Sequence, residues 1–343
     1  MELTRLGRTD LMVTRTSFGV LPLQRVEMEE ATRILRKAFD AGINFYDTAR
    51  SYTDSEEKIG YALSDVRDSI IIATKTPAAT RSEVLADLEV SLRNLKTDYI
   101  DILQLHNPNP LPDPEDSGSS YAGLVEARER GMVRFIGLSS HSLERATAAV
   151  ASGLYDTLQY PISHISTPAD LSVIDQCYHL DVGLIGMKPL SGGLITNARP
   201  AFAFLRKFEN LVPIWGIQRM SELEQILEFD ANPPELDAEM WALVNRDREE
   251  LAGDFCRACG YCLPCSAEIP IPMAARMSLL LRRMPWQQFM SDKWHQDMHR
   301  IESCTDCGHC REHCPYGLDT PTLLRKMLAD YKEFYSTHAE LVD

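Results

Sequence analysis

Four side chains with complementary acid and base chemistry lie in the first third of the chain. Asp47, Lys75 and His106 each end an apolar segment, and Tyr52 follows the first of them by five residues. A tyrosine can protonate an oxygen that becomes negative, but its ordinary pKa of about 10 is high for work at neutral pH. A nearby ammonium lowers that pKa, and an aspartate holds the ammonium charged and oriented. The set therefore suggests proton donation to a carbonyl that accepts a hydride, with His106 positioning the carbonyl oxygen.

The segments that carry these residues have the composition of buried strands, and amphipathic helical patterns lie between them. Strands are expected near residues 16–20, 44–47, 70–75, 99–106, 133–138, 156–160, 183–187 and 211–215, and helices near 28–41, 55–64, 81–95, 120–131, 142–152, 169–180, 198–208 and 221–229. Alternating strands and helices indicate a parallel α/β sheet, and eight of each close a (β/α)8 TIM barrel. Because barrel active sites lie at the C-terminal strand ends, we expect the four side chains to converge there.

The chain is longer than a single barrel requires. At 343 residues and 44% hydrophobic content, it can form a barrel of about 250 residues and a smaller unit. Asn232-Pro233-Pro234 breaks the pattern, and a helix is expected over 237–251. We therefore expect a barrel over residues 1–235 and a second, mainly α-helical domain over 236–343. The connection at 107–119 is too rich in proline to be regular and directly follows His106. It is expected to shape a substrate pocket, and the alternative is a solvated connector without contact to substrate.

Charge and hydropathy narrow the classes of partner. The formal net charge is −15 and no basic block occurs, which argues against nucleic acid and against an anionic membrane surface. No uninterrupted apolar run is long enough for a signal peptide or a membrane span. We expect a soluble cytoplasmic protein that acts on a small molecule.

Eight of the nine cysteines form two tight groups near the C-terminus. They are Cys256, Cys259, Cys262 and Cys265 in the first group, and Cys304, Cys307, Cys310 and Cys314 in the second. The second group is followed by Pro315 and has the spacing of bacterial ferredoxins, which bind [4Fe–4S] clusters. Without a secretory signal, such groups indicate metal binding rather than disulfides. Cys177 lies apart and is expected in the core.

The two groups predict a ferredoxin-like domain with two [4Fe–4S] clusters. In two-cluster ferredoxins the fourth cysteine of each run binds the other cluster. This rule assigns Cys256, Cys259, Cys262 and Cys314 to one cluster, and Cys304, Cys307, Cys310 and Cys265 to the second. The first group departs from the pattern, because two residues rather than three separate Cys262 from Cys265. Zinc is the alternative, since zinc sites with four cysteine ligands also use pairs of cysteines separated by two residues.

Motifs over roughly the first 230 residues resemble those of the aldo-keto reductase superfamily. They are Leu6-Gly7-Arg8-Thr9, Phe45-Tyr46-Asp47-Thr48-Ala49, Tyr52 with Ser55-Glu56-Glu57, Ala73-Thr74-Lys75, Gln104-Leu105-His106, Ile136-Gly137-Leu138-Ser139-Ser140-His141 and Met187-Lys188-Pro189-Leu190. The resemblance implies reduction of an aldehyde or ketone by NAD(P)H at the Tyr52, Lys75, Asp47 and His106 site. It also implies that a hairpin within residues 1–15 closes the bottom of the barrel. The whole chain is similar to a subgroup with a fused ferredoxin-like domain.

A hydride donor needs a binding site, and the chain has no Gly-x-Gly-x-x-Gly motif of a Rossmann unit. TIM barrels bind phosphate in the loops after the seventh and eighth strands. By resemblance, the nucleotide would contact Met187, Lys188, Pro189, Leu190, Gly192, Gly216 and Arg219, with Ser139, Ser140 and Gln159 at the nicotinamide carboxamide. Relatives that prefer NADPH carry Lys-Ser and a later Arg around the adenosine 2′-phosphate, where this chain has Gly216-Ile217 and Glu222. Arg219 alone remains nearby as a cation. We therefore expect NADH to bind at least as well as NADPH.

Three functions fit these patterns to different degrees. The first is an oxidoreductase whose clusters either relay electrons, with a redox partner protein, or serve structurally. The second is an iron–sulfur electron-transfer protein that uses the barrel as a docking scaffold. The third is a non-enzymatic regulatory subunit, which no feature specifically supports. The complete set of Asp47, Tyr52, Lys75 and His106 favours the enzyme.

Overall fold

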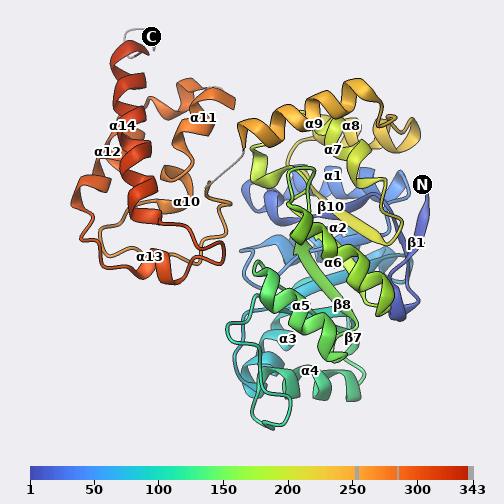
Figure 1. Ribbon diagram of the computed structural model, residues 1–343. Helices are drawn as coiled ribbons and strands as arrows, with labels where there is room; N and C mark the ends of the chain where they lie inside the picture. The colour runs from blue at the N-terminus through green and yellow to red at the C-terminus, as the bar shows by residue number, and fades with distance from the viewer. Residues whose placement is uncertain (252–254, 284–285, 339–343) are drawn as a thin grey trace. The chain divides into compact units, whose positions relative to one another are not determined.

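The computed structural model describes residues 1–251, 255–283 and 286–338 (Figure 1). The chain divides into two compact units, of which the first contains Met1–Pro189 and Ala198–Val244. The second contains Leu190–Asn197 and Asn245–Asp343. The short segment Leu190–Asn197 therefore groups with the cysteine-rich part of the chain, which the sequence pattern did not indicate. Residues 252–254, 284–285 and 339–343 of the predicted second domain lie outside the described residues.

The first unit contains the predicted parallel barrel. Its strands are β3 (Ser17–Gly19), β4 (Phe45–Asp47), β5 (Ile71–Thr76), β6 (Ile100–His106), β7 (Val133–Ser139), β8 (Thr157–Pro161), β9 (Gly183–Met187) and β10 (Leu211–Gly216). All neighbouring pairs are parallel, and β10 pairs with β3 to close the ring. An antiparallel hairpin of β1 (Leu3–Arg5) and β2 (Met12–Thr14) precedes the barrel. The predicted (β/α)8 fold is confirmed.

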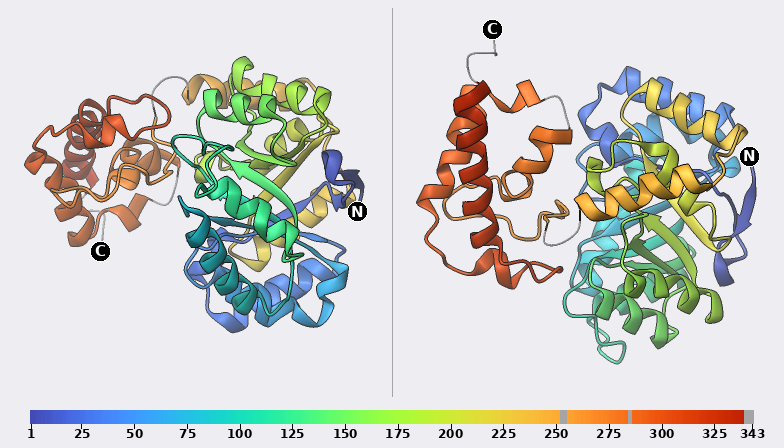
Figure 2. Two further views of the ribbon diagram at one scale, coloured as in Figure 1. Left: turned by 90° about the horizontal axis from the view of Figure 1, so that it is seen from below. Right: turned by 45° about the horizontal axis from the view of Figure 1, so that its top comes forward.

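Helices surround the strands (Figure 2). They are α1 (Met28–Asp40), α2 (Ser55–Leu63), α3 (Arg81–Leu95), α4 (Ser120–Glu129), α5 (Leu143–Ser152), α6 (Pro168–His179), α7 (Ala198–Leu205), α8 (Met220–Ala231) and α9 (Ala238–Glu250). Local sequence explains several boundaries: Thr80 forms a capping box with Glu83 at the start of α3, and Gly153 ends α5 in a left-handed conformation. The proline-rich connection before α4 is irregular, as predicted, and Ser119 at its end caps that helix.

The barrel interior changes from apolar to polar along the strands. Near the hairpin, Phe45, Ala73 and Ile102 pack together with Leu6 and Val13. Alternate strand residues face the same side of a sheet. Two positions further along the same strands, the interior positions are therefore occupied by Asp47, Lys75 and Gln104. Burial of the apolar layer fixes the register, and the register places the polar side chains at the C-terminal strand ends. Cys177 on α6 is fully buried, as predicted.

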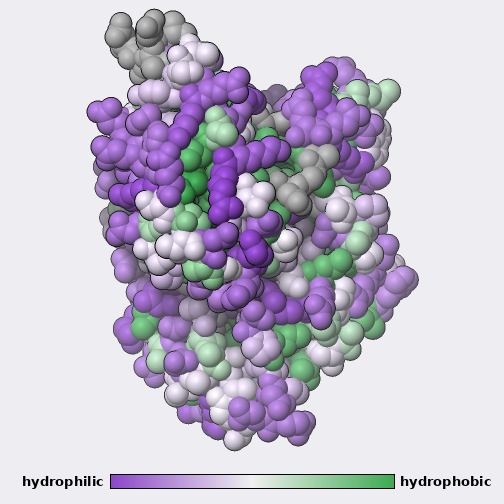
Figure 3. Space-filling model, turned by 60° about the vertical axis from the view of Figure 1, so that its left-hand side comes forward, coloured by the Kyte–Doolittle hydropathy of each residue, from purple (hydrophilic) through white to green (hydrophobic). Residues whose placement is uncertain are grey.

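The second unit is mainly α-helical. Its helices are α10 (Ile271–Ala274), α11 (Met277–Arg283), α12 (Asp292–His299), α13 (His309–Glu312) and α14 (Thr320–His338). The longest, α14, packs against the other four, and its Tyr331 is fully buried and donates a hydrogen bond to the Phe289 carbonyl. Within the described ranges, no helix is both long and apolar enough to cross a lipid bilayer. Hydrophilic side chains predominate on the face shown in Figure 3, with small scattered hydrophobic groups.

Candidate active site

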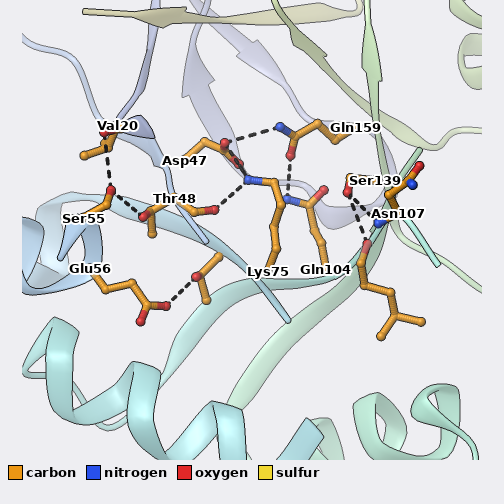
Figure 4. Close-up of polar contacts among 12 residues, drawn as sticks. Val20, Asp47, Thr48, Ser55, Glu56, Lys75, Gln104, Asn107, Ser139 and Gln159 are labelled. Atoms are coloured by element: carbon orange, nitrogen blue, oxygen red, sulfur yellow. Dashed lines mark hydrogen bonds and ion pairs between the residues drawn. The ribbon is translucent and has the colours of Figure 1, made fainter. Parts of the chain in front are cut away.

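A buried ion pair lies at the centre of the site (Figure 4). The Lys75 Nζ atom donates to both Asp47 carboxylate oxygens at 2.7 and 2.8 Å and to the Thr48 carbonyl at 2.6 Å. Asp47 is 2% exposed and Lys75 is 1% exposed. Burial lowers the pKa of Lys75 and raises the pKa of Asp47, while the opposite charge of each partner counteracts both shifts. Mutual attraction thus holds a lysine charge inside the barrel.

Tyr52 and His106 lie beside this pair. Tyr52 follows β4 in a bend and is half-buried, and the Lys75 Nζ atom lies 5.2 Å from the centre of its ring. The Tyr52 and His106 rings are nearly perpendicular, with centres 5.7 Å apart. Burial lowers the pKa of His106 to about 3, and the positive charges of Lys75 and Lys188 add to the shift. The fold therefore brings together all four predicted side chains, with the histidine as a neutral imidazole.

A chain of two amides orients the aspartate. The Gln104 Nε2 atom donates to Gln159 Oε1 at 2.9 Å, and Gln159 Nε2 donates to Asp47 Oδ1 at 3.3 Å (Figure 4). Both glutamines are almost fully buried inside the barrel. A buried carboxylate with fixed donors keeps one orientation, because each broken bond would leave a polar group unsatisfied. Gln104 was predicted as part of a motif, but sequence reasoning gave it no role.

Glu56 is a further buried charge, which the sequence placed in a motif but gave no role. It is 1% exposed, accepts a hydrogen bond from Thr74 Oγ1 at 2.7 Å and another from Asn94 at 3.2 Å. Its negative charge also raises the pKa of Lys75, opposing the effect of burial. One signal could have identified it: Glu56 shares the buried face of α2 with Ile59 and Leu63, at helical spacing. A carboxylate on such a face needs partners inside the fold.

The two serines expected at the nicotinamide carboxamide have partners within the protein. Ser139 Oγ donates to the Leu105 carbonyl at 3.3 Å and accepts from the Asn107 amide at 3.2 Å. Ser140 Oγ donates to the Ser142 carbonyl and accepts from the Ser142 amide, both at 3.1 Å. These bonds join the end of β7 to β6 and to the following turn. Both side chains are thus fixed in place at the C-terminal end of the barrel.

The segment after β9 has an unusual backbone. Met187 ends β9 inside the barrel and is 9% exposed. Lys188 has a positive φ of 58°, and after Pro189 and Leu190 the chain enters a short 3-10 turn, η4 (Ser191–Gly193). The amides of Gly193 and Ile195 donate to the Leu190 carbonyl, and Pro189 has no N–H. Other backbone N–H groups of such a turn are of the kind that binds phosphate.

The end of β10 presents a carboxylate where the sequence analysis expected a phosphate contact. Gly216 ends the strand, and the Glu222 Oε2 atom accepts hydrogen bonds from the amides of Gln218 at 2.7 Å and Arg219 at 3.0 Å. The Arg219 guanidinium lies 3.9 Å from the same carboxylate, with its side chain 75% exposed. Glu222 therefore accepts hydrogen bonds from the two amides directly before α8 and places negative charge at that helix N-terminus.

The eight clustered cysteines all lie in the second unit. Burial raises the pKa of the Cys256 thiol, and the thiols of Cys259 and Cys314 add to this shift. Burial also raises the pKa of Cys310, with smaller contributions from Cys304, Cys307 and Cys265. These contributions place Cys314 near the first run and Cys265 near the second, while the Cys310 thiol also contributes to the raised pKa of Cys262.

The second thiol group surrounds a cavity of about 340 Å³, which Cys265, Cys304, Cys307 and Cys310 line together with Cys262. In the first group, the Ala258 amide donates to the Cys256 sulfur at 3.4 Å. Amide bonds to sulfur are among the features that tune iron–sulfur clusters. In the described part of the chain, no three Cys, His, Asp or Glu side chains gather closely enough for a single metal ion. The donor set and the cavity fit a cluster.

Known proteins match both units. The sequence model of the Aldo/keto reductase family matches residues 16–203, and that of a 4Fe-4S dicluster domain matches residues 255–319. The aldo-keto reductase YhdN of Bacillus subtilis is 31% identical over 216 residues, which cover 57% of this chain and 64% of YhdN. The L-galactose dehydrogenase of Arabidopsis thaliana is 30% identical over 219 residues, which cover 58% of this chain and 69% of that enzyme. These relatives are thus matched over about two thirds of their length.

Among solved structures, the aldo-keto reductase AKR11C1 from Bacillus halodurans in its holo form superimposes with a TM-score of 0.63. The identity is 21%, and the match covers 72% of this chain and 96% of that one. At this identity the likeness speaks for the fold.

Proposed function

Because this chain belongs to the aldo/keto reductase family of oxidoreductases, we propose that its barrel reduces an aldehyde or ketone with NAD(P)H. The observation that carries the proposal is the convergence of Tyr52, Lys75, Asp47 and His106 at one end of the barrel. Lys75 lies between a carboxylate that holds its charge and a tyrosine ring that faces this charge. Such an arrangement supports a proton donor at neutral pH.

A reduced nicotinamide bound at this site would supply a hydride to the carbonyl carbon of the substrate. Tyr52 gives its hydroxyl proton to the carbonyl oxygen, so that an alcohol forms and the C=O π bond is replaced by C–H and O–H bonds. Lys75 stabilises the resulting phenolate through its charge, and Asp47 keeps that charge in place. His106, as a neutral imidazole, donates an N–H to the carbonyl oxygen and fixes its distance from Tyr52.

We assign the nucleotide to the loops after β9 and β10. The backbone of Lys188, Pro189, Leu190 and Gly192 would follow the pyrophosphate, Met187 would cover a face of the nicotinamide ring, and Gly216 and Arg219 would lie at the adenosine. Ser139, Ser140 and Gln159 would line the carboxamide. The Gln159 Nε2 atom carries two hydrogens, of which Asp47 accepts one, so the other remains as a donor.

In the second unit, which matches a 4Fe-4S dicluster domain, we propose two [4Fe–4S] clusters. Cys256, Cys259, Cys262 and Cys314 would hold the first cluster, and Cys265, Cys304, Cys307 and Cys310 the second. Anaerobically purified protein should contain about eight iron and eight sulfide per chain. Zinc without sulfide would overturn the assignment. Bleaching of the clusters by NADH or NADPH alone would indicate electron exchange with the barrel, and a redox titration would separate low potentials from a structural role.

Tyr52→Phe tests the catalytic proposal. The variant should lower kcat by about 10²- to 10⁴-fold, because it removes the proton donor. Nucleotide affinity, measured by fluorescence titration, should change less than about twofold, since the ring remains. Tyr61→Phe is the matched control, because Tyr61 is 58% exposed on α2. Equal turnover by wild type and Tyr52→Phe would refute the proposed mechanism. A wild-type protein that reduces no aldehyde or ketone but cycles its clusters would favour the electron-transfer alternative.

A further inference from the structure

The segment Leu190–Asn197 has a conformation that needs external support. The φ angles of Ser191, Gly192 and Gly193 are 49°, 69° and 89°, so three consecutive residues are left-handed. This conformation is costly for Ser191, because a side chain with a Cβ atom disfavours it. Strained backbone of this kind persists when surrounding groups hold it. The segment also groups with the cysteine-rich unit, so residues of that unit contact it.

Arg276 provides such support. It lies between α10 and α11 and is only 5% exposed. Its Nη1 atom donates to the Gly192 carbonyl at 3.0 Å, and Nε donates to the Pro272 carbonyl at 3.0 Å. Its Nη2 atom contacts the Met273 sulfur at 3.4 Å. The planar guanidinium thus holds the left-handed turn through Nη1 and helix α10 through Nε.

The same guanidinium lies near the first cysteine run. A Cβ atom on Gly192 would lie 3.5 Å from Arg276 Nη1 and 3.8 Å from the carbonyl of Arg257, the residue that follows Cys256. One buried cation therefore lies close both to the turn after β9 and to the backbone beside a proposed cluster ligand.

We propose that Arg276 is a positioning residue that couples the nucleotide loop after β9 to the cluster held by Cys256. The inference rests on the proposed function, which assigns the pyrophosphate to this loop and Cys256 to a cluster. The fork of Arg276 keeps the loop in its left-handed shape, and its charge favours the reduced, more negative cluster. An anionic nucleotide at the loop competes for the same positive charge. Nucleotide binding should therefore lower the potential of this cluster, and reduction should weaken nucleotide binding by the same factor.

Charge and hydrogen-bond geometry can be separated by two substitutions. Arg276→Met removes both, whereas Arg276→Lys keeps the charge and loses the planar fork. Arg282→Met is the matched control, because Arg282 lies on α11 of the same unit in an exposed ion pair with Asp330. ADP-ribose is the probe, since it carries the pyrophosphate but no nicotinamide and leaves the clusters in their redox state. Calorimetry on holoprotein, hydrogen exchange of the 190–197 peptide and potentiometric EPR are the readouts.

We expect Arg276→Met to bind ADP-ribose about tenfold more weakly, to exchange the 190–197 amides faster and to lower the potential of one cluster. Arg276→Lys should show the binding and exchange effects with a near-native potential, and Arg282→Met should show none. If reduction of the cluster weakens ADP-ribose binding tenfold in wild type, saturation with ADP-ribose should lower the cluster potential by about 59 mV.

Native ADP-ribose affinity in iron-replete Arg276→Met, with unchanged exchange and potentials, would overturn the coupling. If Arg276→Met loses iron, the same measurements on Arg276→Lys test the coupling. Absence of ADP-ribose binding by wild type would instead overturn the nucleotide assignment of the proposed function, and the linkage with it. Binding by wild type with no shift in either potential would show that Arg276 supports the loop alone and would reject the link to the cluster.

Discussion

The preference between NADH and NADPH should depend on one carboxylate, Glu222. Its Oε2 atom accepts hydrogen bonds from the amides of Gln218 and Arg219, directly before α8. An adenosine 2′-phosphate at the start of this helix would need the same donors. The phosphate would have to displace this carboxylate or lie beside it. Both the loss of donors and the repulsion of like charge disfavour NADPH, whereas the 2′-hydroxyl of NADH carries no charge.

The magnitude follows from Coulomb's law. The Glu222 side chain is 42% exposed, so the dielectric constant of water applies. Charges of −1 and −2 about 5 Å apart then repel by about 1–2 kcal/mol after screening at 0.1 M salt. Glu222→Gln keeps an acceptor for the two amides and removes the charge. It should therefore improve NADPH affinity by about five- to thirtyfold, and leave NADH affinity within about threefold.

Fluorescence titration with both nucleotides gives the ratio of dissociation constants directly. Glu224→Gln is the matched control, because Glu224 is exposed on the same helix and changes the net charge equally. Wild type should bind NADH at least as well as NADPH, and the control should keep that ratio. A hundredfold preference of wild type for NADPH, or a Glu222→Gln ratio equal to that of the control, would refute the reasoning. Added salt should screen the repulsion between Glu222 and the 2′-phosphate, and so weaken the preference for NADH as Glu222→Gln does.

Two further predictions concern the buried pair and the histidine. Asp47→Asn should lower the free energy of unfolding of the barrel by about 3–5 kcal/mol in urea, because Lys75 stays buried without its full partner. Asp181→Asn breaks an ion pair that is half exposed, and should cost less than about 1 kcal/mol. The pKa of His106 is lowered to about 3, so its NMR resonances should stay constant from pH 8 to pH 5, with assignment by His106→Asn. A midpoint near 6.5 would contradict the neutral imidazole.

Sequence periodicity predicted the barrel because each strand and helix has a simple local pattern. Helix α1, for example, buries Ala31, Ile34, Leu35 and Ala38, the spacing from which it was predicted. The convergence of Asp47, Lys75 and His106 followed from the same logic, because parallel strands of a barrel end on one face. Local pattern and global topology agree in this part of the chain.

Contacts between distant segments could not be predicted in this way. The bond between Gln104 and Gln159 joins residues 55 positions apart, and Glu56 meets Asn94 across 38 positions. Nothing in the periodicity of β6 or α2 specifies these partners, since they depend on how neighbouring strands and helices pack. The grouping of Leu190–Asn197 with the cysteine-rich unit has the same origin. In each case, tertiary packing decided which polar group would satisfy another.

The assignment of Cys265 and Cys314 illustrates how structure adds to spacing, and iron analysis can test it. The spacing left the cluster of Cys265 ambiguous, but its thiol contributes to the raised pKa of Cys310 and lines the cavity of the second run. The Cys314 thiol contributes to the raised pKa of Cys256 in the first run. If Cys259 and Cys314 hold one cluster, Cys259→Ala/Cys314→Ala should lose no more iron than either single variant, about four of eight atoms.

The matched double variant Cys259→Ala/Cys265→Ala removes one ligand from each proposed cluster and should lose nearly all iron. The two double variants delete the same number of thiols, so their difference reports which ligands are shared rather than how many are lost. Iron and sulfide content, measured anaerobically beside the cluster EPR signals, gives the comparison. The opposite result would be an iron-free Cys259→Ala/Cys314→Ala variant and a half-loaded Cys259→Ala/Cys265→Ala variant. It would mean that each run holds its own cluster and that the crossed assignment is wrong.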